Sequence, residues 1–523
     1  MRCSTQVQMR SGADGRHFLS VCQHLALACV SASAFAIGGA AQAAVTISSG
    51  ATQNMDCSNG ICSPTATDAN LSVTDLENDL ASGNLTVTTT GSGVQANNID
   101  VAARLSWSAS STLGLDAYQS IRIDRTMTAK GVGGLVFTTN DGGTGGMLSF
   151  GRNGAASFTY RFSDVSINGT AFTLEPTLAA LARDIAANPA GAFALARNFD
   201  ASKDGVYGLA PVETTFTGTF EGLGHTISNL TIVERRGASD IGLFADVGIG
   251  GTVESVALSN VTVKTLQDRD RAIGSLVGEN EGTLFNDRAS GSVYSKKDPE
   301  AGGLVGASSF TSSILQSSAD VSVRCDKIYC DAGGLVGESA AIISQSRASG
   351  HVTATGFVGG LVADNSGPIS QSFATGAVLG SDAGALVGAN DTSGSSIGTI
   401  ANSYATGEVS SGSEGGGLLA EDSDGNGVSI QNAYATGLVN PLRGQGAGFV
   451  CGALGSQVAN GYWDTTTSGT TDGLCGGNVP EVVGLTTQQL QSGLPSGFDS
   501  SIWAENPGIN NGFPYLIANP PPK

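Results

Sequence analysis

Short apolar runs alternate with glycine, asparagine and aspartate along the chain, and one apolar pentad returns throughout its second half. Its central Leu or Phe recurs after 33, 28, 31, 26, 25, 32 and 31 residues. A repeat of this length is typical of a solenoid, in which each coil packs only on its neighbours. The central residues are Leu243, Leu276, Leu304, Leu335, Leu361, Leu386, Leu418 and Phe449.

A second motif, one residue followed by Ala and then mostly by Ser or Thr and Gly, lies inside these repeats. The residue before the Ala is Arg288, Ser318, Arg347, Phe373, Tyr404 and Tyr434 in successive units. A position that accepts Arg is unsuited to a dry core, so we expect it to face outward. Phe373, Tyr404 and Tyr434 are therefore predicted to form an exposed ladder that binds sugar rings or peptide. The alternative is a ladder that only stabilises the coils by stacking.

The first section, residues 44–175, contains short strand-like runs bounded by turn residues, together with one helix predicted from Thr74 to about Ala81. Residues 176–237 are predicted to be a junction with a helix at 178–187 and two strands, 215–220 and 225–232, across a tight turn. Residues 238–469 hold the repeats, and 470–523 form a tail that shields the end of the solenoid. The predicted fold is all-β: a right-handed parallel β-helix with one or two short helices at the N-terminal end and at the junction.

Composition and charge exclude some classes of function. The 523 residues include 75 Gly, which suits many tight turns, and the net charge of −20 excludes a simple nucleic-acid-binding surface. An N-terminal basic stretch, a short apolar run and Ala41-Gln-Ala43 predict a secretory signal peptide over residues 1–43. No other run is long and apolar enough to span a membrane.

Signal removal leaves an even number of cysteines, and an exported chain is expected to pair them as disulfides. The spacing suggests Cys57 with Cys62, Cys325 with Cys330, and Cys451 with Cys475.

Candidate chemistry is sparse, and we predict no catalytic residues and no obligatory cofactor. Asp422, Asp424 and Asn426 have the alternate spacing of a calcium loop, although the residue at its twelfth position is Ala433 rather than Glu. A solvated acidic turn is the alternative.

A second acidic cluster, Asp268-Arg-Asp-Arg271 with Glu279 and Glu281, is the best candidate for polysaccharide cleavage, and its alternative is a solvated loop. His225 and His351 lack triad partners at a recognisable spacing and are expected in turns or at the surface.

The sequence also resembles two known protein families. Residues from about 50 to 172, including Gly83–Gly91 and Thr144–Gly151, resemble the β-helical region of filamentous-haemagglutinin-type adhesins, but the Asn-Pro-Asn export signature of that family is absent. The repeats resemble the GLUG-motif family of bacterial surface adhesins and peptidase stalks, and Tyr462-Trp-Asp-Thr465 resembles its closing unit.

These resemblances imply an exported adhesin or surface-structure protein, secreted or held at the outer membrane of a Gram-negative bacterium. We expect it to bind an extracellular glycan or protein and to leave the cell through an outer-membrane transporter, without spanning the membrane itself. The alternatives are a β-helical polysaccharide lyase or glycosidase, and a stalk that binds nothing.

Overall fold

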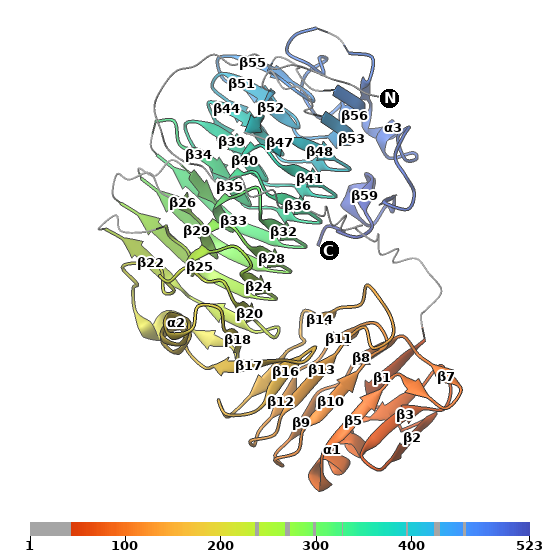
Figure 1. The fold of residues 1–523 in the computed structure, drawn as a ribbon. Coiled ribbons are helices and arrows are strands. Elements are labelled where there is room, and N and C mark those ends of the chain that lie inside the picture. Colours follow the sequence, from red (N-terminus) through yellow and green to blue (C-terminus); the bar gives the residue numbers. More distant parts are fainter. Residues whose placement is uncertain are drawn as a thin grey trace, which may run out of the picture. The chain divides into compact units, whose positions relative to one another are not determined.

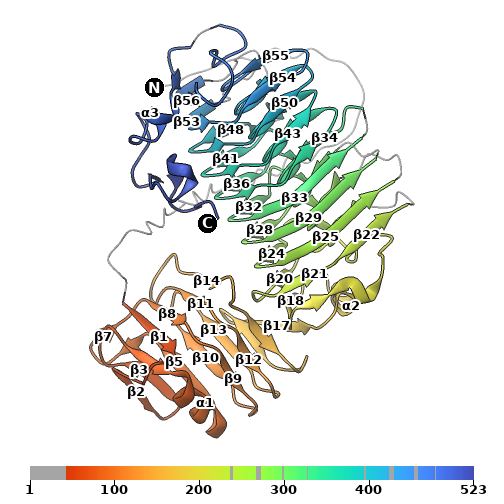
Figure 2. The same cartoon turned by 180° about the vertical axis from the view of Figure 1, so that it is seen from behind.

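The structure is a computed structural model, and it describes residues 43–235, 240–266, 272–296, 300–326, 328–393, 396–422, 429–452, 457–477 and 479–522. Apart from Ala43, the predicted signal peptide lies outside the described residues. The described chain is a β-solenoid of about 13 turns with three short α-helices. Figure 1 shows its strands stacked in parallel rows, and Figure 2 shows the same rows from behind. The predicted parallel β-helix is confirmed.

The N-terminal coils contain three rows of parallel strands, preceded by an antiparallel pair, β2 with β3. The first row is β4 (Asn70–Ser72), β1 (Ala44–Ser48), β8 (Asn98–Val101), β11 (Ile121–Ile123) and β14 (Leu148–Phe150). The second is β3 (Ile61–Pro64), β5 (Leu85–Thr88), β10 (Leu113–Asp116), β13 (Leu135–Thr138) and β16 (Val165–Ile167), and β2 (Met55–Ser58) is the antiparallel neighbour of β3. The third is β9 (Leu105–Trp107), β12 (Met127–Ala129) and β15 (Ala156–Phe158).

Helix α1 (Val73–Ser82) confirms the helix predicted near Thr74, but its N-cap is Ser72, whose hydroxyl accepts a hydrogen bond from Thr74 N at 3.2 Å. Its buried face consists of Leu76 and Leu80. A second helix, α2 (Leu178–Ala187), follows β17 (Thr170–Glu175) as predicted, and it buries Leu178, Leu181 and Ile185 in the apolar core of the C-terminal coils.

The tight turn predicted in the junction is present, because His225 N donates to Gly222 O at 2.9 Å, but the strands on its two sides do not form an antiparallel pair. Strands β20 (Thr219–Glu221) and β21 (Thr226–Ser228) do not pair with each other, because each pairs in parallel with a strand of the neighbouring coils. His225, between them, is buried rather than exposed, and its Nε2 donates to the carbonyl O of Ala156 at 2.8 Å. Burial lowers the pKa of His225 to about 4. This bond joins the two sets of coils.

The C-terminal coils are built from three sheets. The entry sheet, which precedes the central Leu of each pentad, is β26 (Ala272–Ile273), β30 (Glu300–Gly302), β34 (Asp331–Gly333), β39 (Phe357–Gly359), β44 (Asp382–Gly384), β51 (Glu414–Gly416) and β55 (Gln445–Ala447). The exit sheet, which follows it, is β23 (Phe244–Val247), β27 (Val277–Asn280), β31 (Val305–Ser308), β35 (Val336–Ser339), β40 (Val362–Asn365), β45 (Val387–Asn390) and β52 (Leu419–Asp422).

The long sheet closes each coil. It contains β17 and β18 (Ala192–Leu195), β19 (Phe199–Asp200), β20 to β22 (Thr231–Glu234), β24 (Thr252–Glu254), β25 (Ala257–Thr265), β28 (Thr283–Phe285), β29 (Arg288–Ser295), β32 (Ser313–Leu315), β33 (Ser318–Cys325), β36 (Ile342–Ser344), β37 (Arg347–Ala348), β38 (Val352–Thr353), β41 (Pro368–Ser370), β42 (Phe373–Ala374), β43 (Val378–Gly380), β48 (Thr399–Ala401), β49 (Tyr404–Ala405), β50 (Val409–Ser411), β53 (Ser429–Ala435), β54 (Val439–Pro441), β56 (Gln457–Asp464) and β57 (Val482–Leu485).

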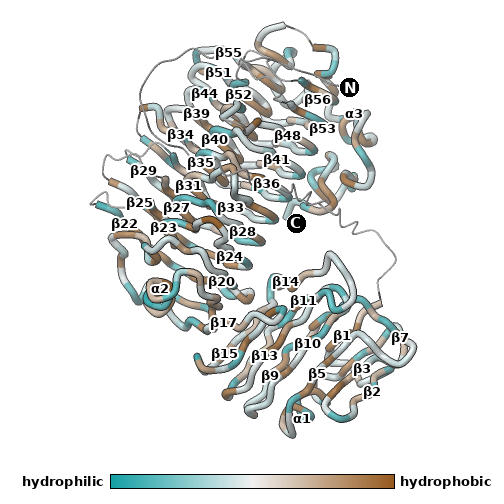
Figure 3. Tube along the Cα trace, viewed as in Figure 1, coloured by the Kyte–Doolittle hydropathy of each residue, from teal (hydrophilic) through white to brown (hydrophobic). Residues whose placement is uncertain are grey.

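The pentads stack directly on one another. Leu304 N donates to Leu335 O at 2.9 Å, Leu335 N donates to Leu361 O at 2.8 Å, and the central residues from Leu276 to Phe449 continue this ladder. Their side chains are buried in one continuous core. In Figure 3 apolar and polar residues alternate along the strands, as expected for coils with one face inside. Regular stacking of the pentads, the main prediction from the repeat, is confirmed.

Close backbone approach explains the glycines of the pentad. A Cβ at Gly302 would collide with the carbonyl O of Val305 in the same bend, and a Cβ at Gly303 would collide with the carbonyl O of Gly334 in the next coil. Only glycine fits where two backbones meet this closely.

Each coil turns a further corner through one residue in the left-handed region. The series has φ between 46° and 58°, and it consists of Ser255, Asn286, Gln316, Gln345, Gln371, Asn402, Asn432 and Asn460. Asn is the side chain that tolerates this conformation best after Gly, which fits its frequency here.

The stacked core predicts a large effect of truncating one central residue. Leu335→Ala should lower the free energy of unfolding by about 2–5 kcal/mol, because the side chain is fully buried and leaves a cavity. Leu379→Ala, on the 42% exposed Leu379, is the control and should change it by about 0.5 kcal/mol or less. Urea unfolding followed by circular dichroism compares the two, and equal effects would contradict the stacked core.

Candidate functional site

The predicted aromatic ladder exists, but it is not exposed. Phe373, Tyr404 and Tyr434 align on adjacent strands of the long sheet, and Tyr462 continues the row. The first three side chains are at most 1% exposed. They form a separate apolar cluster with residues from the end of the chain, namely Leu490, Phe498, Trp503, Phe513 and Leu516. The prediction of an exposed ligand-binding ladder is therefore corrected.

The ring geometry also argues against sugar stacking. Phe373 and Tyr404 have ring centroids 4.8 Å apart and planes within 8°, and Tyr404 and Tyr434 are 5.0 Å apart and within 3°. The ring faces therefore contact one another along the solenoid, and only ring edges point away from it. Sugars stack on ring faces, so this row suits the alternative, stabilisation of the coils.

The segment that covers the row, which we call the C-terminal strap (residues 486–522), is held by polar contacts as well as by apolar ones. Tyr434 Oη donates to Pro514 O at 2.6 Å, and Tyr462 Oη donates to Ser496 O at 2.8 Å. Trp503 Nε1 donates to Asn402 Oδ1 at 3.2 Å.

The strap contains α3 (Thr487–Leu490) and an antiparallel pair of two-residue strands, β58 (Trp503–Ala504) and β59 (Tyr515–Leu516). The tail thus covers a lateral face as well as following the last coil, whereas the sequence suggested only an end cap.

A column of carboxylates lies on each side of the pentad bend, and we call these two columns the acidic corner. The exit sheet carries Asp246, Glu279, Glu338, Asp364 and Glu421 in one aligned column, with Ala307 and Ala389 between them. The entry sheet carries Glu300, Asp331, Asp382 and Glu414 in a second column, with Phe357 between Asp331 and Asp382. Sequence reasoning missed these columns, although a carboxylate at both ends of several pentads was a visible signal.

Burial and like charges raise the pKa values in this corner. Burial and then Glu338 raise the pKa of Glu300 to about 8 and that of Asp364 to about 7, and burial raises that of Asp331 to about 6. The charged neighbours that act on these groups are all carboxylates. Such groups either share protons or ligate hard divalent cations, which prefer carboxylate oxygens.

At one end of the acidic corner, Asp240, Asp246 and Glu279 bring carboxylate oxygens within 4.8 Å of one another. The predicted calcium loop is only partly described. Asp422 is buried and aligns with Asn390 in the exit sheet, while Asp424 and Asn426 lie outside the described residues. The Asp268–Arg271 cluster also lies outside them. Both interpretations stay predictions.

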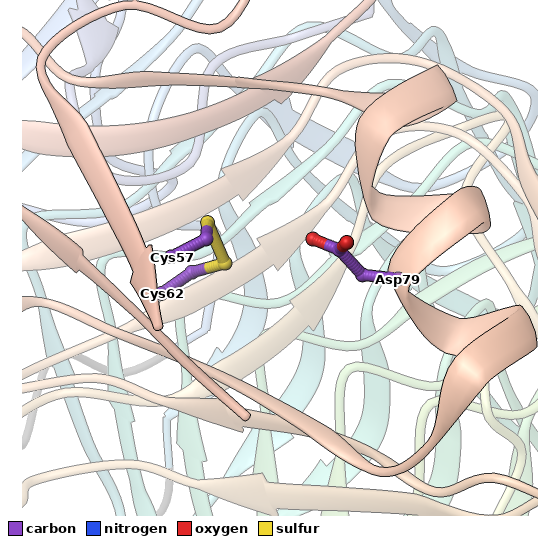
Figure 4. Close-up of side chains that lie close together, drawn as sticks. All are labelled: Cys57, Cys62 and Asp79. Carbon is purple, nitrogen blue, oxygen red and sulfur yellow. A yellow bond between two sulfur atoms is a disulfide. The ribbon is translucent and has the colours of Figure 1, made fainter. Parts of the chain in front are cut away.

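The predicted disulfides are confirmed as Cys57–Cys62, Cys325–Cys330 and Cys451–Cys475. Figure 4 shows the first of them facing Asp79 of α1. These three residues bring ligand atoms within 4.8 Å, but both sulfurs are in the disulfide and so offer no thiolate to a metal. Three disulfides are expected of a chain that matures in an oxidising compartment.

A polar cavity of about 340 Å³ lies where the two sets of coils meet. Glu221 and Glu254, from adjacent strands β20 and β24, line it with Asn140, Asn168 and Phe172. Burial and then Glu254 raise the pKa of Glu221, and burial raises that of Glu254. A protonated carboxyl beside a second carboxyl is the minimum set for acid–base chemistry on a sugar.

This chain is partly similar to known proteins, and no family model matches it. The chain is 39% identical over 124 residues to halomucin of Haloquadratum walsbyi (strain DSM 16790 / HBSQ001); this stretch is 23% of this chain and 1% of halomucin. An IgA1 protease structure is similar over 53% of this chain and 23% of its own, with 21% identity and a TM-score of 0.38, too low to carry an argument. The β-solenoid and the halomucin match fit a surface or structural role. No helix of the described chain has the length and apolarity needed to cross a lipid bilayer.

The acidic corner predicts that the protein is less stable at alkaline pH. Unfolded carboxyls ionise by about pH 5, whereas Glu300 and Asp364 keep their protons to about pH 8 and 7 in the folded chain. The folded chain therefore binds more protons between these limits, and its free energy of unfolding should fall by about 1–3 kcal/mol from pH 5 to pH 8.5. Urea titrations at several pH values measure this fall.

Glu338→Gln should flatten that pH dependence, because Glu338 raises the pKa of both groups. Glu408→Gln, at an exposed position, is the matched control and should leave the dependence unchanged. A stability that rises with pH would contradict the assignment.

We expect the strap to detach from the solenoid without unfolding it. Trp503→Ala should weaken docking of the strap by about 3–5 kcal/mol, because the indole is fully buried against Tyr404 and Tyr434. Limited proteolysis should then cleave within residues 486–522 while the circular dichroism of the solenoid persists. Phe310→Ala, on a ring that is 69% exposed, should change neither. Loss of the whole β signal in Trp503→Ala would show that the strap is part of the main core.

Proposed function

We propose that this chain is an exported bacterial surface protein of the GLUG-motif type, with a filamentous-haemagglutinin-like N-terminal region, and that it acts as an adhesin or surface-structure module. The observation that carries this proposal is a β-solenoid of about 13 turns with three disulfides, Cys57–Cys62, Cys325–Cys330 and Cys451–Cys475. A solenoid of this kind offers long lateral columns of side chains, which suit contact with an extended ligand. The local likeness to halomucin supports a surface role.

The ligand is proposed to be an extracellular glycan, bound by a lateral face other than the aromatic row. A net charge of −20 and the acidic corner disfavour nucleic acid and anionic membranes as partners. Divalent cations would lessen the repulsion between the carboxylates of the corner, so calcium is proposed as a stabilising ion rather than as a catalytic one.

A second candidate function, a polysaccharide-cleaving enzyme, is favoured by one observation. Glu221 and Glu254 meet in the cavity between the coils, and Asp287 is buried nearby with Oδ2 unpartnered among the described residues. In that reaction Glu221 would be the acid, because burial and then the charge of Glu254 raise its pKa.

One paired experiment separates the two functions. The full chain is applied to a glycan array, and the same preparation is assayed for release of reducing sugar from the glycans that bind. The proposed adhesin should bind without turnover. Turnover that is lost in Glu254→Gln and kept in Glu408→Gln would contradict the adhesin and favour the enzyme. Binding to no glycan would leave only a stalk.

A further inference from the structure

Two arginines on one outward column lack acidic partners in a strongly acidic protein. Arg288, Ser318 and Arg347 align on adjacent strands β29, β33 and β37. In the described part of the chain neither guanidinium forms an ion pair, whereas Arg122, Arg183 and Arg324 each pair with an aspartate. Arg347 is partly buried, where an uncompensated charge is unfavourable.

The surroundings of Arg347 supply neutral and like-charged groups. Its Nη1 donates to Asn519 Oδ1 of the strap at 3.2 Å, and the amide nitrogen of Asn519 is already used by the carbonyls of Ser346 and Gln371. Burial and then the charge of Arg288 lower the pKa of Arg347. The strap thus fixes one face of Arg347 and supplies it with no negative charge.

The neighbouring polar groups do not compensate either arginine. Asp320, two residues beyond Ser318 on β33, accepts a hydrogen bond from Ser349 Oγ at 3.3 Å and pairs with neither arginine. The buried Tyr404 Oη has no hydrogen-bond partner among the described residues, and burial raises the pKa of this hydroxyl. Tyr404 is therefore neutral and gives Arg347 no negative charge.

We propose that Arg288, Ser318 and Arg347 form a binding site for the carboxylate or sulfate group of an acidic polysaccharide. Adjacent strands are about 4.8 Å apart, so the two arginine Cα atoms are separated by about 10 Å, and the charge of Arg288 acts on Arg347 across this distance. Guanidinium groups donate paired hydrogen bonds to planar oxyanions, and the Ser hydroxyl adds a third donor. This site names the ligand class of the proposed surface function and rests on it.

The site is tested by titrating the full chain with oligogalacturonate, a sulfated oligosaccharide and a neutral oligosaccharide of similar length, in low and moderate salt. At least one of the two acidic oligosaccharides should bind. Arg288→Gln should weaken that binding about tenfold or more. Arg324→Gln removes the same charge from an arginine that is already paired with Asp326, so it should bind like the unchanged chain. Inorganic sulfate should compete.

The outcomes separate this site from the function on which it rests. Equal binding by Arg288→Gln and the unchanged chain, or tight binding of the neutral oligosaccharide alone, would overturn the oxyanion site and leave the glycan-binding role standing. Arginine-dependent binding of inorganic sulfate without any glycan would overturn the polysaccharide as the ligand. Arg347→Gln is a second variant: it should weaken acidic ligands as well, with circular dichroism and protease resistance reporting whether the strap remains docked.

Discussion

The backbone hydrogen bonds that run from coil to coil through the pentads hold the structure in register. Leu304, Leu335 and Leu361 each bond to the next central residue, and the side chains fill one core. A parallel ladder of this kind requires close backbone contact at the bend, and glycine at positions such as 302 and 303 makes that contact feasible. A register slip would turn the core side chains outward.

The same periodicity decides the surface. When one coil lies on another, each outward residue joins a column of side chains with a spacing of about 4.8 Å. A residue type that recurs at one position of the repeat therefore forms a column along the solenoid. Carboxylates beside the pentad become the two columns of the acidic corner. Where the residue before Ala is aromatic, the column is a stack of rings. Where it is arginine, the column carries two positive charges that form no ion pair among the described residues.

These columns differ in what covers them, and this difference bears on function. The strap covers the aromatic column, and near its own end it contacts Arg347 through Asn519. The column beyond this point holds Ser318 and Arg288, and the acidic corner lies on the other two sheets. A solenoid built this way covers its apolar column with the strap and keeps charged residues in its other columns, which suits the proposed surface role.

The sequence by itself determined the solenoid, the stacking of its pentads and the helices α1 and α2, because each depends on a local pattern, and the cysteine spacing suggested the three disulfides. Leu335 must stack on Leu304 once the period is known, and Cys325 can reach Cys330 along the same short segment. The sequence did not determine that Tyr404 and Tyr434 would be buried, because the covering residue Trp503 lies at a distance that no local pattern reports. It also did not show that Glu300 and Glu338 face each other across the bend, since only the tertiary fold brings two successive coils and two sheets to one corner.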